Sequence, residues 1–207
     1  TNPVQATGGT DLVNTLVDYT LGANVENLRL LAAGAVNGTG NSLNNLLYAG
    51  AGNNLLDGAG GNDTVSYADA SGAVTVSLGI AGAQGTSASG LDTLISIENL
   101  SGSSFNDTLT GDATANVIDG RAGADTLIGG DGSDAYFVDH VGDVVSETNA
   151  VLATGGSDTV HSYLAAYTLT NNVETLQILA SGAANGTGNS LNNLLYAGAG
   201  DNVLDGA

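Results

Sequence analysis

Acidic and amide side chains recur at a fixed spacing in the middle of the chain. Four contiguous nine-residue frames fill 102–137 and carry Asp107, Asn116, Asp125 and Asp134 at their sixth positions. If frames two apart stack, Asp107 lies on Asp125 and Asn116 lies on Asp134. Two carboxylates within a few Å repel each other, and a cation held between them converts the repulsion into ligation. The spacing therefore predicts divalent-cation sites.

Calcium suits such sites best. It takes about six to eight oxygen ligands, and glycine-rich turns expose backbone carbonyls that supply those the side chains do not. Magnesium needs a tighter octahedron and keeps its water, while zinc prefers sulfur or imidazole, and the chain has no cysteine and two histidines. Degenerate frames in 40–66 and 188–205 carry mostly asparagine at the sixth position, which removes a charge, so we expect them to bind more weakly.

Composition excludes several classes of function. The 207 residues carry a net charge of −19 and two basic residues, Arg29 and Arg121, which argues against nucleic acid or an anionic membrane as a partner. The absence of cysteine excludes disulfides and thiol chemistry. We expect no membrane span and no Sec-type signal peptide, because no apolar run is long enough and no basic segment precedes one. His140 and His161 stand apart from any nucleophile motif, so we predict no catalytic site.

Each frame predicts a short strand after a tight turn. Its last three residues place one large apolar side chain between two outward ones, and the six before them are rich in glycine, which permits the positive φ angles of tight turns. Two successive frames then form one coil, and successive coils stack as parallel strands. Leu109, Ile118, Leu127 and Tyr136 would meet in a narrow apolar seam. We therefore predict an all-β fold, a parallel β-roll or β-helix solenoid of nonapeptide repeats.

The chain also repeats over a longer period. Residues 1–11 return at 148–158, and residues 19–52 return at 167–200. The chain opens and stops partway through this period, which predicts a segment of a longer repetitive protein. The predicted organisation is a solenoid spacer at 1–36, a degenerate array at 37–66, a spacer at 67–101, an array at 102–137, a spacer at 138–184 that repeats 1–36, and a truncated array at 185–207 that repeats 37–59.

The spacers predict wider coils of the same solenoid. Val74, Val76, Leu78 and Ile80 alternate with other residues, which indicates a longer strand with one buried face. A separate globular insert at 67–100 stays open as an alternative.

Other acidic residues predict hydrogen bonds rather than metal ligands. Glu26, Glu98 and Glu174 recur in tetrapeptides of the VENL type, and we expect them to cap a neighbouring coil, with a ligand role left open. Three further aspartates close their frames before glycine and are expected to form turns with their own backbone: Asp57, Asp119 and Asp205.

Residues 37–66, 99–137 and 185–207 resemble the hemolysin-type calcium-binding repeats of RTX proteins, which Gram-negative bacteria secrete. The last frame of the central array, GGDGSDAYF, matches the G-G-x-G-x-D-x-U-x pattern of that family at every fixed position. The spacers, among them 19–28 and 65–78, are similar to those between such arrays in large secreted repeat proteins.

The resemblance implies which atoms bind calcium. In the family, two turns that are two frames apart bind one calcium ion. The upstream turn contributes the carbonyls of positions two and four and the side chain of position six. The downstream turn contributes the carbonyls of positions one and three and the side chain of position six. Carried over position by position, this gives a first site of Ser103, Phe105, Asp107, Gly120, Ala122 and Asp125; a second of Asp112, Thr114, Asn116, Gly129, Asp131 and Asp134; and a third, weaker one of Asn41, Leu43, Asn45, Gly58, Gly60 and Asp63.

This sequence departs from the family pattern within those sites. Phe105 and Leu43 replace the glycine at position four, and Asn116 and Asn45 lack a charge. The frame at 188–196 lacks its downstream partner and keeps half a site.

The resemblance implies a structural, calcium-binding role without enzymatic activity. We expect a segment of a secreted bacterial RTX surface protein or adhesin, a stalk or surface-layer element that leaves the cell by type I secretion and folds on exposure to extracellular calcium. Its partners would be calcium ions and adjacent repeats of the same longer chain, with homotypic assembly left open. The main alternative is an RTX appendage of a secreted enzyme, such as a lipase, protease or polysaccharide epimerase. A glycan- or ice-binding face built from threonine and asparagine rows is a third.

Overall fold

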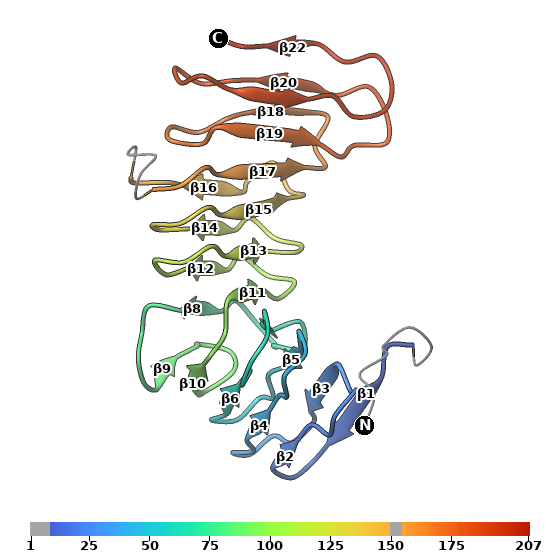
Figure 1. Cartoon of the computed structure of the whole chain (residues 1–207), viewed down its shortest axis with the longest axis vertical. Helices are drawn as coiled ribbons and strands as arrows, with labels where there is room; N and C mark the ends of the chain where they lie inside the picture. The colour runs from blue at the N-terminus through green and yellow to red at the C-terminus, as the bar shows by residue number, and fades with distance from the viewer. Residues whose placement is uncertain (1–8, 150–154) are drawn as a thin grey trace.

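The computed structural model describes residues 9–149 and 155–207, and every regular element within these ranges is a β-strand. The strands wind into a parallel solenoid of about ten turns, which Figure 1 shows as a stack of coils with the two termini at opposite ends. The predicted all-β fold is confirmed. The structure contains, in the ranges it describes, no helix long and apolar enough to cross a membrane.

One long sheet follows the whole stack, and three shorter sheets lie opposite it (Figure 1). In spatial order the long sheet contains β1 (Leu12–Thr15), β3 (Asn27–Leu30), β5 (Leu46–Tyr48), β7 (Thr64–Ser66), β11 (Asn99–Ser101), β13 (Val117–Asp119), β15 (Ala135–Val138), β17 (Thr159–Ser162), β19 (Thr175–Ile178) and β21 (Leu194–Tyr196). The first shorter sheet contains β2 (Tyr19–Thr20), β4 (Gly38–Thr39), β6 (Leu55–Asp57), β10 (Leu91–Ile95) and β9 (Gln84–Gly85). The second contains β8 (Thr75–Ser77), β12 (Thr108–Thr110), β14 (Thr126–Ile128) and β16 (Val144–Ser146). The third contains β18 (Ala166–Thr168), β20 (Asn185–Thr187) and β22 (Leu204–Asp205).

The register of the central array is two nonapeptide frames. Thr108 of β12 pairs with Thr126 of β14, and Val117 of β13 pairs with Ala135 of β15, both in parallel. Among the strand pairs of the described residues, β9 and β10 run antiparallel and all others are parallel. The register places each sixth-position residue against the one two frames later, as the metal sites require.

The core is the predicted apolar seam between the two sides of the solenoid. Leu109, Ile118, Leu127 and Tyr136 are fully buried, one from each of four successive strands. Burying such a side chain contributes about 1.5–3 kcal/mol, so the seam holds each coil to its neighbours without any large central core.

A glycine takes the inward position of β4. A methyl group on Gly38 would crowd Leu28, Leu30 and Leu56, because β3 turns two leucines into the seam at that level. Gly186 has the same role in the second copy, against Leu176 and Ile178. The repeated GTG therefore makes room for bulk on the opposite strand.

Spacer coils vary in width. Tyr136 pairs with Val160, which is more than two frames further along the chain, as expected for a wider coil. However, the coils that join β1 to β3 and β17 to β19 are shorter than two frames. There Val13 pairs with Leu28, and Val160 pairs with Leu176, so the expectation of wider coils is wrong at both places. The seam fixes only the short strands, whereas the turns outside it are free to differ in length.

Residues 67–98 form one enlarged coil of the solenoid, not a separate insert. Its strand β8 pairs with β12, and its strand β10 pairs with β6. The longer strand expected over 74–80 is wrong, because β8 ends at Ser77 and Ile80 is 46% exposed. The Gln84 side chain accepts from the Ser77 N–H and donates to its carbonyl at 2.7 and 2.8 Å. The Gln84 side chain thus makes the two backbone hydrogen bonds with Ser77 that a neighbouring strand would otherwise make.

Candidate metal centres

A backbone hydrogen bond joins the two turns of each predicted site. The sixth-position N–H of the upstream turn donates to the carboxylate at the sixth position two frames later. Asp107 donates to Asp125 Oδ1 at 2.8 Å, and Asn116 donates to Asp134 Oδ1 at 2.8 Å. In the third predicted site, the N–H of Asn45 donates to Oδ1 of its downstream aspartate, Asp63, at 2.7 Å. The structure therefore brings together the turn pairs that the spacing predicts.

The second oxygen of each downstream aspartate has no hydrogen-bond partner. Asp63 Oδ2, Asp125 Oδ2 and Asp134 Oδ2 are buried and unpaired within the part of the chain that the structure describes. Leaving a buried acceptor unpaired costs about 1–3 kcal/mol, and more when it is charged. Three equivalent positions share this cost, which points to one kind of ligand common to all three.

Burial acts on the acidity of the same groups. It raises the pKa of Asp125 to about 7, with the charges of Asp107 and Asp143 adding to the effect. Burial likewise raises the pKa of Asp63 and that of Asp134 to about 6. A cation bound to these carboxylates would offset the cost of their charge.

The unpaired oxygens lie against the first glycine of their own turns. A side chain on Gly58, Gly120 or Gly129 would overlap the Oδ2 atom of the aspartate five residues later. Bare backbone at position one thus lets the carboxylate lie directly against its own turn. The donor set contains only oxygen and fits calcium.

Carbonyl groups of the upstream turn face the downstream turn. Phe105 O lies 2.5 Å from the place where a Cβ atom would lie on Gly123, and Thr114 O crowds Gly132 in the same way. The upstream carbonyl therefore requires glycine at position four of the downstream turn, and no such contact requires it at position four of the upstream turn. The departure at Phe105 falls on the upstream turn, where the side chain is 45% exposed and unhindered.

The three arrays match a known family of repeats. The family described as RTX calcium-binding nonapeptide repeat (4 copies) matches residues 39–69, 101–136 and 187–207. The chain carries RTX calcium-binding nonapeptide repeats. The resemblance drawn from the sequence is confirmed, and these repeats are of the calcium-binding, hemolysin type. No curated protein matches the chain.

In the RTX pairs, the polar side-chain atoms of the upstream sixth residue have hydrogen-bond partners, whereas one oxygen of the downstream aspartate has none. Asp107 accepts from Ser103 N at 2.5 Å and from Val74 N at 2.8 Å. Asn116 Oδ1 accepts from Asp112 N, and its amide donates to Glu98 O, both at 2.8 Å. Asparagine at an upstream sixth position therefore acts as a structural bridge that binds both its own turn and the coil below.

The remaining residues of the predicted RTX sites lie in the same turns, and their ligand roles stay predictions. Asp112 accepts from Thr114 N at 2.8 Å in a local turn, and Asp131 is exposed and accepts from Asn149 Nδ2 at 2.6 Å. Asn41 resembles Asp112, since its Oδ1 accepts from Leu43 N at 2.8 Å. Ser103, Ala122, Gly60 and the first-position glycines would contribute through backbone carbonyls.

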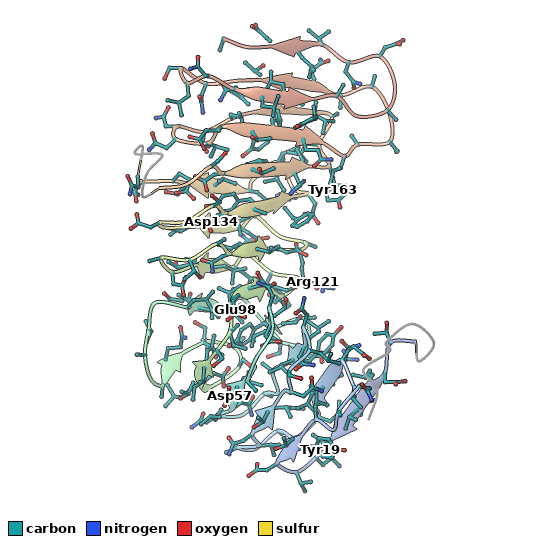
Figure 2. All side chains as sticks on the ribbon, viewed as in Figure 1. Tyr19, Asp57, Glu98, Arg121, Asp134 and Tyr163 are labelled. Atoms are coloured by element: carbon teal, nitrogen blue, oxygen red, sulfur yellow. The ribbon has the colours of Figure 1, made fainter. Side chains whose placement is uncertain are left out.

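The three recurrent glutamates cap neighbouring coils, as predicted. Glu26 accepts from Asp11 N at 2.9 Å, Glu98 from Asp63 N at 2.8 Å, and Glu174 from Asp158 N at 2.8 Å. Each glutamate accepts from a backbone N–H of a neighbouring coil, just as the downstream aspartate accepts from the upstream turn within an RTX array. Figure 2 shows Glu98 and Asp134 at different levels of the solenoid. The predicted turns at Asp57, Asp119 and Asp205 also form, each accepting from the N–H two residues on.

Sequence reasoning missed one acidic cluster next to the central array. Carboxylate oxygens of Asp134, Glu147 and Asp158 lie within 4.8 Å of one another, and the three residues could hold an ion. Glu147 directly follows β16, whose register with β14 places it at the level of Gly129. Asp158 lies more than two frames after Asp134, because the coil is longer there. The GGSD before β17 was the available signal, but it is out of the nine-residue frame.

Proposed function

We propose that the chain is a calcium-dependent structural segment of a secreted RTX surface protein or adhesin, without catalytic activity of its own. The observation that carries this proposal is the set of buried, unpaired aspartate oxygens at Asp63, Asp125 and Asp134, one in each stacked pair of RTX turns. The long repeat, in which 19–52 returns at 167–200, favours a repetitive stalk over an appendage of a secreted enzyme.

The residues of the chain prepare sites that only a cation completes. Bound calcium would supply two positive charges to carboxylates that have no basic partner. The upstream turn holds Oδ1 of the downstream aspartate through a backbone N–H and leaves Oδ2 free. The first glycine gives the carboxylate room to lie against its own turn. Folding and ion capture are thereby coupled.

The charge of the chain links this coupling to its location. With a net charge of −19, compaction is opposed by self-repulsion as long as free calcium is scarce. Such a chain stays extended enough for export and folds outside, where calcium at about 10⁻³ M suffices for extracellular modules. The RTX repeats support this route, since they are typical of type I secreted proteins.

Circular dichroism tests the proposal. The chain in chelator should show the far-ultraviolet spectrum of a coil, and calcium at about 10⁻³ M should convert it to a strand spectrum that excess chelator reverses. Magnesium at the same concentration controls for general screening of charge. A strand spectrum of equal strength in chelator would contradict the proposal.

A further inference from the structure

A three-carboxylate cluster lies where the central RTX array meets the next spacer. Asp134 is the sixth residue of the last nonapeptide, Glu147 follows β16 directly, and Asp158 precedes β17. The three side chains are 2%, 6% and 1% exposed. They come from two successive coils, so the cluster bridges the boundary between the array and the spacer.

Two oxygens of the cluster lack any protein partner. Asp134 Oδ2 and Glu147 Oε2 are buried and form no hydrogen bond with any residue of 9–149 or 155–207. Their sister oxygens are used, because Asn116 N donates to Asp134 Oδ1 and the Tyr136 hydroxyl donates to Glu147 Oε1. Each of these two carboxylates is thus fixed by one oxygen and presents the other, buried and unpaired.

The charges around the cluster are negative. Burial, and then the charges of Asp158, Asp134, Glu174 and Asp131, raise the pKa of Glu147 to about 8. Arg29 is paired with Asp69 at a distant coil, and Arg121 lines another part of the surface with Asp119 and Asp139. Neither arginine is among the groups that act on the pKa of Glu147.

The spacing of the oxygens fits one calcium ion. Oxygens bound to the same calcium at about 2.3–2.6 Å can be up to about 5 Å apart, and the oxygens of this cluster lie within 4.8 Å of one another. Each of the three carboxylates would contribute an oxygen, and backbone carbonyls or water would complete the six to eight oxygens that calcium takes. Gly129 gives the carboxylates room to converge, since a side chain there would overlap Asp134 Oδ2 and Glu147 Oε1.

We propose that Asp134, Glu147 and Asp158 bind a calcium ion in a site that the nonapeptide pattern does not describe. With three carboxylates the site binds calcium more tightly than pairs containing asparagine, because affinity rises with ligand charge. The ion ties the array to the following spacer. This site deepens the calcium-dependent function proposed above and rests on it.

Counting bound calcium tests the site. Glu147→Gln and Asp158→Asn, made separately in the full chain, should each lose about one bound ion per chain, with the remaining ions bound as before. Both residues lie outside the three predicted nonapeptide sites, so those sites stay intact. Glu26→Gln, which changes a buried glutamate that accepts from Asp11 N, should keep the wild-type count.

Terbium luminescence locates the ion. Terbium replaces calcium and emits when a nearby tyrosine is excited, and the hydroxyl of Tyr136 contacts Glu147. Tyr136→Phe should lower the emission while leaving the ion count unchanged, whereas Glu147→Gln should lower both. This pair keeps the test informative if Asp158→Asn does not fold.

The outcomes separate the two proposals. An unchanged ion count and emission in Glu147→Gln would overturn the cluster site and leave the calcium-dependent function standing. A wild-type chain that binds no calcium would overturn the proposed function and the cluster site together. Loss of one ion in Glu147→Gln, with retention of that ion in Asp125→Asn, would show that the cluster is separate from the first nonapeptide site.

Discussion

At the scale of single residues, position within a turn pair decides what an acidic side chain does. The upstream Asp107 is satisfied by Ser103 and Val74, whereas the downstream Asp125 keeps one oxygen unpaired. Aspartate and asparagine are therefore not equivalent at the two places. Upstream, the amide of Asn116 adds a bond to Glu98 O that a carboxylate could not make. Downstream, an amide would remove the charge that holds the ion.

Asp125→Asn should have opposite effects with and without calcium. Burial raises the pKa of Asp125 to about 7, so its ionised form opposes folding at neutral pH. In chelator the folded form of the variant should be favoured by about 1–3 kcal/mol relative to wild type, because the amide carries no buried charge. In calcium the variant should bind fewer ions and unfold at lower denaturant concentration than wild type. The far-ultraviolet strand signal in chelator and urea unfolding in calcium measure these two effects.

Asp119→Asn provides the control for that comparison. Asp119 accepts from Arg121 N at 2.9 Å in a partly exposed turn and belongs to no predicted site. It should behave like wild type in both buffers. If Asp125→Asn lost stability in calcium without binding fewer ions and gained no strand signal in chelator, Asp125 would have only a structural role.

At the scale of the turns, the fourth glycine of a downstream nonapeptide is required by contact and by conformation. Gly123 has a φ of +140°, and a Cβ there would lie 2.5 Å from Phe105 O. Gly123→Ala should destabilise the calcium-bound chain by about 1–3 kcal/mol. Urea unfolding in saturating calcium gives this value.

Gly60→Ala is the matched control for the turn. Gly60 has no heavy atom within 4 Å of its Cβ position and its φ is not positive. Alanine there keeps the backbone carbonyl and should change stability by less than about 1 kcal/mol. If the two alanine variants lost stability equally, crowding by the upstream carbonyl would not explain the pattern.

The turns also show how far sequence alone predicts this molecule. The nine-residue period predicts the short strands, the apolar seam and the two-frame register. The reason is that the large apolar residue of each frame must face its partner across a narrow core. Turn length is outside that constraint, which is why the short coils before β3 and β19 and the enlarged coil at 67–98 could not be foreseen. Glu147 was missed for the same reason. Its partner Asp158 lies more than two frames after Asp134, so no fixed period joins the three.

At the scale of the whole molecule, buried carboxylates accumulate along the solenoid. Burial raises the pKa of Asp92 to about 6, as it does for Asp63 and Asp134, and that of Asp158 to about 7, in addition to Asp125 and Glu147. Each folded-state pKa is higher than the unfolded one, so the folded chain holds more protons. Calcium-free chains should therefore gain stability from protonation.

Stability without calcium should fall as pH rises. The contribution of these groups is fully present below their unfolded pKa values, near pH 4, and is lost as pH rises through the folded values, between about pH 6 and 8. In saturating calcium the trend should reverse below about pH 6, because protons compete with the ion for the same oxygens. The far-ultraviolet strand signal in chelator and the urea midpoint in calcium, each measured from about pH 5 to 8.5, test the two arms. A calcium-free chain whose strand signal grows as pH rises over that range would show that its carboxylates are paired or hydrated rather than buried without a counter-charge.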